Sequence, residues 1–457
     1  MEQTKEGDIN AFFDETPVKS LVIKLGIPAM LAQFFNILYS IVDRIFVGRI
    51  PEVGDLALAS IGVCAPALTA ISAFAYMVGV GGASQMSIRL GQKDMEGAKK
   101  PVNNAFLMLV AISILVTAAA LFWKKPLLYL LGCDDSMYPL ASRYFTIYAA
   151  GTIFPLLGIG MNHFILAQGF SRAGMVSVVI GALTNLILDP ILIFGLDLGI
   201  EGAAIATVTA QGAMAVFALW YLRRKKVPIR LEIGGYDLSM MKRIVTVGIM
   251  PFLITLLDNG VVIILNASLR KYGGADGTTY ITCAAVIQSI FTIVCSPAAG
   301  ITQGCGTLYG YFYGAKEPKK LDQTFTYVLW VCLAYIGGLQ VLILLFPRAF
   351  AGLFLKDAAV MAVCVACIRK YCLGLVGIGV QYAYVDGLTA MGKVKYALPL
   401  SLFRKSLYMI LLLTLPMLLP VKDIFYGAAI SDMVGASFTL VMFFGVVRRK
   451  LRKEMSA

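Results

Sequence analysis

Charged residues are scarce along this chain of 457 residues. Asp, Glu, Lys and Arg together make up 14% of the sequence, and a soluble protein carries nearly twice that fraction. Apolar residues make up 59%, the mean hydropathy is +0.81, and apolar runs of roughly twenty residues or more, each long enough to cross a bilayer, recur along the whole length. The composition therefore excludes a soluble globular protein and predicts an all-α polytopic membrane protein.

Histidine is nearly absent, since His163 is the only one, and the nine cysteines are scattered. The pair Cys364-x-x-Cys367 has the spacing of a metal or redox site, but it lies in an apolar run without a second ligand pair. We interpret it as two small buried apolar residues, and His163 as a structural histidine rather than a proton relay. Because the sequence also lacks a His-Glu-x-x-His motif, we expect neither an enzyme nor a cofactor.

The sequence also leads us to expect no cleaved leader segment and no separate polar domain. The residues before about 17 are polar and charged, without the order of a cleaved signal peptide, so we expect the first spanning helix to be retained. In a soluble protein the net charge of +13 would favour nucleic acid as a partner. Here the basic residues lie in short connections and near the C-terminus, where topology and anionic membrane lipids explain them better. No nucleic-acid partner is expected.

The apolar runs predict twelve membrane-spanning helices. In the first half they cover about 17–49, 55–90, 98–123, 138–169, 172–196 and 201–222. In the second half they cover about 238–271, 277–313, 320–346, 360–390, 394–418 and 424–447. Basic residues concentrate in alternate connections, so the positive-inside rule places both termini and the central linker in the cytoplasm.

The sequence repeats itself at an offset of 223 residues. Pro28 matches Pro251, Asn36 matches Asn259, and Gly91-Gln92-Lys93-Asp94 matches Gly314-Ala315-Lys316-Glu317. Because each repeat holds an even number of helices, both have the same orientation in the membrane. We expect two six-helix bundles related by this parallel repeat, namely an N-terminal lobe (1–222), a cytoplasmic linker (223–237) and a C-terminal lobe (238–457). Such a repeat is typical of secondary transporters, in which two lobes enclose a site.

Polar side chains form stripes on the predicted helices of the first lobe. On the first helix the stripe holds Gln33, Asn36, Ser40 and Asp43, and it is flanked by Tyr39. Upstream of it, Pro28 should bend the helix, because proline removes a backbone donor and crowds the preceding turn.

The fifth helix carries a second stripe, in which Asn185 and Asp189 lie one turn apart. Pro190 follows directly and leaves the carbonyl of Leu186 without its helical donor, which favours a small hard cation beside the carboxylate. Polar faces on the other helices hold Tyr144, Asn162 and Thr207. Uncharged residues of this kind often only hold helices together. A carboxylate inside the membrane is far more costly, so Asp43 and Asp189 are the leading functional candidates.

The second lobe does not copy this pattern, because Asn266 stands at the position equivalent to Asp43. Its intramembrane charged residues are Asp258, Asp386, Arg404, Lys405 and Asp432. Arg404 could form a buried pair with either Asp386 or Asp432. Whether the second lobe has a cation site of its own stays open.

Three motifs together resemble the multidrug and toxic compound extrusion (MATE) family. The first is Lys24-Leu25-Gly26-Ile27-Pro28 followed by Val42-Asp43-Arg44-Ile45-Phe46-Val47-Gly48. The second is Asn185-Leu186-Ile187-Leu188-Asp189-Pro190, and the third is Gly199-x-x-Gly202-Ala203-Ala204-x-Ala206-Thr207. The likeness covers essentially the whole chain and is greatest to the prokaryotic DinF-type branch.

This resemblance implies antiport by alternating access, with export of small amphipathic, often cationic compounds in exchange for H+ or Na+. By the same resemblance, the coupling cation, including a sodium ion, binds at Asp43, Asn185, Asp189 and Thr207. The substrate cavity is lined by Gln33, Asn36, Tyr39, Tyr144 and Asn162, and Pro28 bends the first helix. The expected setting is the cytoplasmic (inner) membrane of a prokaryote, among its lipids, with the monomer as the functional unit.

Other functions fit the sequence less well. A flippase or exporter of a lipid-linked or other amphiphilic metabolite is the main alternative, but such proteins often have a cationic cavity, whereas the first lobe here is acidic. An intramembrane enzyme would need a clustered nucleophile, a metal set or paired acids near an interface. A channel would need a polar ring along the whole pore, and the acids differ between the two lobes.

Overall fold

The computed structural model describes residues 6–355 and 357–456. These residues form helices and no strands. Eleven helical segments are long and apolar enough to cross a membrane, and a further pair, α6 (Tyr138–Ala150) and α7 (Ile153–Ala167), forms one more span with a bend of 52°. The prediction of an all-helical protein with twelve spans is therefore confirmed.

The N-terminal lobe holds the first six spans. After α1 (Glu6–Glu15), its helices are α2 (Val18–Gly48), α3 (Gly54–Gly91), α4 (Met95–Phe122), α5 (Lys124–Leu130), α6, α7, α8 (Ser171–Pro190) and α9 (Gly199–Arg223). A π-helical turn, Ile191–Gly195, extends α8. The predicted ends of the spans agree with these bounds to within a few residues.

The C-terminal lobe holds the other six spans. Its helices are α10 (Leu238–Tyr272), α11 (Gly277–Gly314), α12 (Pro318–Leu345), α13 (Pro347–Gly352), α14 (Ala358–Cys372), α15 (Leu375–Gln381), α16 (Gly387–Ala390), α17 (Val394–Leu418), α18 (Tyr426–Met442) and α19 (Arg448–Ser456). A π-helical turn, Tyr382–Asp386, joins α15 to α16, and a second one, Phe443–Val447, joins α18 to α19.

Four short helices were not predicted from the sequence, namely α1, α5, α13 and α19. They are too short to span a membrane. The first of them packs against the far lobe, where Phe13 is fully buried with its ring centroid 4.6 Å from that of Tyr311. The Tyr311 hydroxyl also donates a hydrogen bond of 3.1 Å to Asp14. Consequently α1 is packed into the folded structure.

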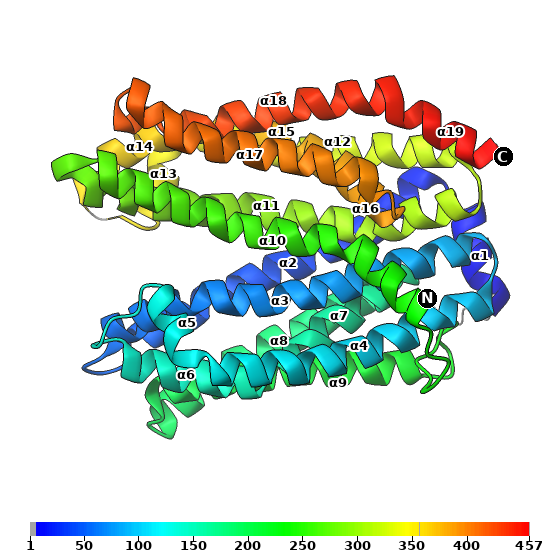
Figure 1. The fold of residues 1–457 in the computed structure, drawn as a ribbon, viewed down its shortest axis with the longest axis horizontal. Helices are drawn as coiled ribbons and strands as arrows, with labels where there is room; N and C mark the ends of the chain where they lie inside the picture. Colours follow the sequence, from blue (N-terminus) through cyan, green and yellow to red (C-terminus); the bar gives the residue numbers. More distant parts are fainter. Residues whose placement is uncertain (1–5, 356, 457) are drawn as a thin grey trace.

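The two lobes form separate bundles, which lie one above the other in Figure 1. Their repeat relation is visible in the bounds, since α3 shifted by 223 residues coincides with α11. The contacts between the lobes follow the same symmetry, because α2 packs against α11 and α3 packs against α10.

Glycines let the helices of the two lobes approach closely. A Cβ atom added to Gly91 would lie 2.0 Å from the carbonyl oxygen of Tyr311, and one added to Gly314 would lie 2.0 Å from that of Ile88. These glycines are equivalent in the repeat. Small residues at helix interfaces of this kind allow tight packing where lipid offers no hydrophobic driving force.

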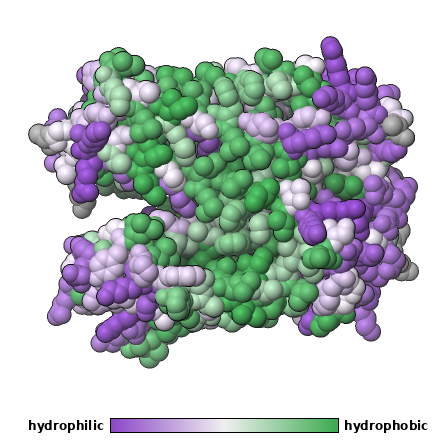
Figure 2. Space-filling view, viewed as in Figure 1, coloured by the Kyte–Doolittle hydropathy of each residue, from purple (hydrophilic) through white to green (hydrophobic). Residues whose placement is uncertain are grey.

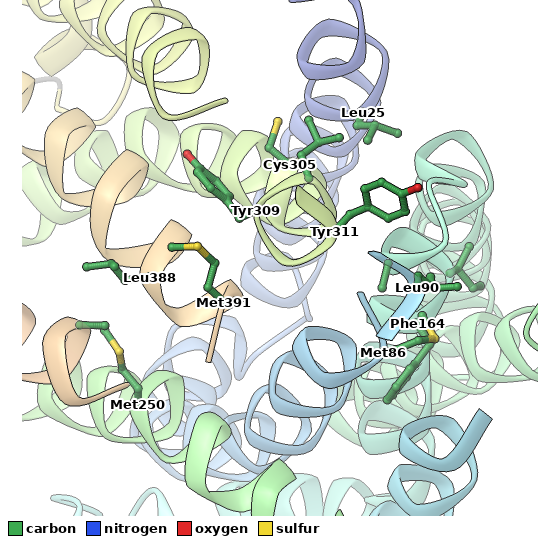
Figure 3. Close-up of a cluster of buried hydrophobic side chains, with 14 of the residues drawn as sticks. Leu25, Met86, Leu90, Phe164, Met250, Cys305, Tyr309, Tyr311, Leu388 and Met391 are labelled. Atoms are coloured by element: carbon green, nitrogen blue, oxygen red, sulfur yellow. The ribbon is translucent and has the colours of Figure 1, made fainter. Parts of the chain in front are cut away.

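The buried apolar residues form one cluster shared by the lobes and two that each belong to a single lobe. The shared cluster includes Leu25 of α2, Leu90 of α3 and Tyr309 of α11 (Figure 3). It lies toward the end of the molecule that carries α1 and α19. At the opposite end, near α5 and α13, the surface is hollowed between the lobes (Figure 2). The lobes are thus joined at one end and separated at the other.

The linker between α9 and α10 is attached to the N-terminal lobe. The side-chain oxygen of Asn103 accepts a 2.9 Å hydrogen bond from the backbone of Glu232, and that of Asn104 accepts one of 2.8 Å from Asp237. Gln168, which directly follows α7, accepts a further bond of 2.9 Å from the backbone of Ile229. The polar groups of this linker are therefore held by α4 and by the C-terminal end of α7.

Candidate functional site

Asp43 of α2 and Asp189 of α8 meet inside the N-terminal lobe, where the two helices pack together. Their carboxyl groups lie within hydrogen-bonding reach of each other. The amide nitrogen of Asn185 donates to Oδ1 of Asp189 over 3.2 Å, and both of these α8 residues are buried. The stripes predicted on the two helices therefore face one another.

The oxygens of this cluster are mostly without donors. Oδ1 of Asp43, Oδ1 of Asn185 and Oδ2 of Asp189 are all buried and accept no hydrogen bond. No ion pair in the described part of the chain includes either aspartate, although the exposed Arg44 acts on Asp43 at electrostatic range. Two carboxylates in contact repel unless a proton or a cation lies between them. Oxygen ligands of this kind suit a small hard cation.

The end of α8 is irregular beside this cluster. Pro190 has no backbone N–H to donate, and the chain continues as a π-helical turn in which the nitrogen of Leu196 donates to the carbonyl of Ile191 over 2.9 Å. A Cβ atom on Gly202 of α9 would lie 2.7 Å from the carbonyl carbon of Leu192. The glycine of the third motif thus allows α9 to pack directly on this turn.

Thr207 is linked to Asp43 only indirectly, by way of Tyr144. Its side chain on α9 lies within hydrogen-bonding reach of Tyr144 on α6, and Tyr144 is within electrostatic range of Asp43. Tyr39 lies within electrostatic range of both aspartates and of Tyr76 on α3. Tyr39 and Tyr144 therefore lie near the carboxylate pair, and Tyr76 lies near Tyr39.

A central cavity of about 740 Å³ lies between the two lobes, and Tyr76 is part of its wall. From the N-terminal lobe, Asn36 and His163 also line it. The ring of His163 meets that of Tyr76 edge-on, with centroids 5.8 Å apart. The carboxylate pair is not among the lining residues, so the carboxylate cluster and the cavity are separate spaces.

The other residues expected at the cavity lie around it. Gln33 donates a 3.3 Å hydrogen bond to Gln303, which lines the cavity from α11. Asn162 faces Gly174 of α8 instead, and its Oδ1 is buried without a partner. A helix turns by about 100° per residue, so the one-residue difference between Asn162 and His163 determines which of them meets the cavity.

Pro28 does not interrupt α2, which is continuous from Val18 to Gly48. The segment around it packs closely on α11, since a Cβ atom on Gly300 would lie 2.6 Å from the carbonyl oxygen of Ala29. The proline therefore lies in the part of α2 that packs against α11 of the C-terminal lobe.

The sequence model of MatE matches residues 28–191 and 252–414. The chain belongs to the MatE family. The two matched segments are offset by 223 to 224 residues, so each lobe of this MATE protein holds one copy of the family's unit.

Similar proteins cover the full length of the chain. It is 21% identical to the multidrug export protein MepA of Staphylococcus aureus strain NCTC 8325 over 447 residues, which is 97% of each chain. A MATE family transporter of the MOP superfamily in an outward-facing conformation superposes with a TM-score of 0.90 at 22% identity, covering 99% of this chain and all of the other. A MOP superfamily transporter of Pyrococcus furiosus, described as having a binding pocket of reverse polarity, gives the same TM-score and identity over the full length of both chains. These likenesses establish the MATE fold.

The C-terminal lobe of this MATE protein buries charges of both signs. Arg404 of α17 donates to Asp432 of α18 over 2.7 Å, so the buried pair foreseen for Arg404 forms with Asp432 rather than with Asp386. Lys405 pairs with Asp258 of α10, and Asp386 accepts a 2.6 Å bond from the hydroxyl of Thr302.

The pairing of Lys405 with Asp258 was not foreseen from the sequence. Two cations and three carboxylates within the spans of one lobe were the available signal, because buried charges seek partners. All five of these residues line the central cavity. The cavity is therefore acidic and basic on its C-terminal wall, and nearly uncharged on its N-terminal wall.

Proposed function

We propose that this protein is a secondary active multidrug efflux transporter, which exports amphipathic, often cationic compounds in exchange for H+ or Na+. The MatE family match and the similarity to the multidrug export protein MepA support the export of drugs. The observation that carries the coupling is the contact between Asp43 and Asp189, whose outer oxygens are buried without donors. Such a pair is stabilised by binding a proton or a sodium ion.

Helix α2 connects the cation site to the cavity. It carries Asp43 near one end, contributes Asn36 to the cavity wall, and packs against α11 of the other lobe. A cation bound between Asp43 and Asp189 draws α2 and α8 together and so alters both the cavity and the lobe interface. Tyr39, within range of the aspartates and of Tyr76, offers a second route between the two spaces.

Coupling further requires that the cation and the substrate each bind the two orientations of the transporter with different affinity. The lobes meet at the end that carries the basic linker and are apart at the other. By the positive-inside rule the basic end faces the cytoplasm, so this arrangement opens outward. In the proposed cycle, cation entry from outside releases the substrate, and the lobes then reopen toward the cytoplasm around the same cavity. The protein acts in the cytoplasmic membrane of a prokaryote and functions as a monomer.

The experiment is efflux of a fluorescent cationic dye from proteoliposomes, first under an imposed sodium gradient and then under a proton gradient. We expect Asp43→Asn and Asp189→Asn to reduce gradient-driven efflux to that of protein-free liposomes. The matched control is Asp197→Asn, an exposed aspartate with a positive φ of 53° that asparagine also tolerates. Undiminished efflux in both the Asp43→Asn and the Asp189→Asn variant would refute the coupling role, and the gradient that drives efflux identifies the ion.

A further inference from the structure

The charged groups on the C-terminal wall of the cavity are unequal in their freedom to move. Arg404 and Asp432 form a pair with side chains 14% and 4% exposed, so neither can leave without stranding a buried charge. In the pair of Lys405 and Asp258, the lysine side chain is 7% exposed but that of the aspartate is 51% exposed. Asp258 therefore remains solvated when Lys405 turns away, which makes this pair exchangeable.

One donor on this wall has no acceptor. Nε of Arg404 is buried and makes no hydrogen bond within the described part of the chain, although Arg404 lines the cavity. A buried donor without a partner costs free energy, and the cost is larger for a charged group. Because other atoms of Arg404 line the cavity, an acceptor on a bound ligand would be a partner for this donor. In the N-terminal lobe the unpaired charged groups are acceptors instead.

We propose that Lys405 and Nε of Arg404 form a recognition site for the acidic group of a zwitterionic amphiphile. Lys405 exchanges Asp258 for the carboxylate of the substrate, and Arg404 donates its free N–H to the same group while it keeps Asp432. The released Asp258, and Asp386, which is held only by the hydroxyl of Thr302, then face the cationic part of the molecule. This names a substrate class and rests on the proposed export function.

A purely structural role accounts for less of the arrangement. The two ion pairs do tie α17 to α10 and to α18, which is a sufficient reason for their presence. It does not account for the unpaired Nε–H of a guanidinium group whose residue lines the cavity, or for the half-exposed partner of a buried lysine. A free carboxylate on the ligand satisfies both features.

The test uses two probes that differ in one group, a rhodamine dye with a free carboxylate and the methyl ester of the same dye. Their dissociation constants are measured by fluorescence anisotropy on the full-length protein in nanodiscs, without any ion gradient. We expect Lys405→Gln to weaken binding of the carboxylate dye about tenfold and to change that of the ester less than about twofold. Lys405→Arg should retain binding of the carboxylate dye.

The matched control is Lys370→Gln. Lys370 forms a 2.6 Å pair with Asp423 in the same lobe but does not line the cavity, so this variant should bind both dyes as the unchanged protein does. The double variant Asp258→Asn with Lys405→Gln removes both charges together, so no unpaired charge remains to disturb folding. It should fold, and like the single Lys405→Gln variant it should bind the ester more tightly than the carboxylate dye. An equal loss of both dyes in a folded Lys405 variant would overturn the proposal, as would failure of the unchanged protein to bind the carboxylate dye. Neither result depends on gradient-driven efflux, which tests the proposed function separately.

Discussion

In the N-terminal lobe the buried charged groups at the candidate site are carboxylates alone, whereas the C-terminal lobe buries carboxylates together with Arg404 and Lys405. The two lobes nevertheless share a repeat, and their backbones agree closely where the lobes touch. Gly91 and Gly314 occupy equivalent positions, and each lies against a backbone carbonyl of the other lobe, that of Tyr311 or that of Ile88. Asp43, in contrast, stands opposite Asn266.

This difference separates two kinds of constraint. Close approach of backbones is needed at both copies of the lobe interface, and Gly91 and Gly314 allow it at equivalent positions. Buried charge is free to differ, because one lobe can leave carboxylates unpaired for a cation while the other pairs them internally. The same kind of mutation should therefore act differently in the two lobes.

The largest expected effect is the loss of a buried cation in the C-terminal lobe. Arg404→Met leaves Asp432 buried without its partner and should lower the free energy of unfolding by about 3–5 kcal/mol. Denaturant unfolding in detergent micelles measures it. Adding Asp432→Asn to the same protein removes the stranded charge and should recover most of the loss. If Arg404→Met alone were as stable as the unchanged protein, the ion pair would contribute nothing to the free energy of unfolding.

A smaller effect is expected at the lobe interface, and it should be the same in both halves. Gly314→Val places a side chain against the carbonyl of Ile88, and Gly91→Val does so against Tyr311. Each should cost about 1–3 kcal/mol through overpacking and widen the joined end. Distances between spin labels on the two lobes measure the widening. Gly337→Val is the control, because a Cβ there meets nothing within 4 Å. Unequal losses of stability in Gly91→Val and Gly314→Val would show that the two copies of the lobe interface are not equivalent.

Removing a charge from the N-terminal lobe should not destabilise the protein, in contrast to the loss of Arg404. Asp189→Asn relieves the contact with Asp43, so without sodium the protein should be as stable as before or more stable by up to about 1 kcal/mol. A cation that binds only the folded protein stabilises it, and this stabilisation should vanish in the variant. Thermal unfolding in sodium chloride and in choline chloride measures both quantities. A clear loss of stability in choline would show that the pair is structural.

The smallest effect is expected at α1. Asp14 contacts Lys93 of the N-terminal lobe over 3.8 Å and the hydroxyl of Tyr311 in the other lobe over 3.1 Å. Because the lysine is exposed, Asp14→Asn should cost less than about 1 kcal/mol. The exposed neighbour Glu15 provides the control as Glu15→Gln. Proteolysis of the N-terminal segment at increasing temperature compares the two, and equal protection would show that Asp14 adds nothing.

Much of the fold was predictable because it depends on local composition. The twelve spans follow from the length of the apolar runs. Asn185 and Asp189 were expected on one face of their helix because they are four residues apart. Short helices such as α1 were missed because half of its residues are polar and no apolar run marks it. The bend between α6 and α7 was missed as well, since the apolar pattern continues across it.

Contacts between helices were less predictable, because they depend on how each helix is rotated about its axis. The sequence offered two acids as partners for Arg404 and could not choose between them. The resemblance placed Asn162 at the cavity, but in the folded protein the packing of α7 brings His163, one position later, to the cavity wall. That α2 belongs to one lobe yet packs along the other could be known only from the assembled bundles.

The attachment of the linker has a mechanical consequence. Asn103, Asn104 and Gln168 hold it to the N-terminal lobe, while the carboxylate of Asp237 caps the first turn of α10 by accepting from the nitrogen of Ser239 over 2.8 Å. The backbone of this one residue is thus bound on one side to α4, and its side chain is bound on the other side to α10. The covalent connection between the lobes is accordingly a pivot about a single residue long, and any rocking of one bundle against the other that keeps these bonds must be taken up by the backbone torsions there.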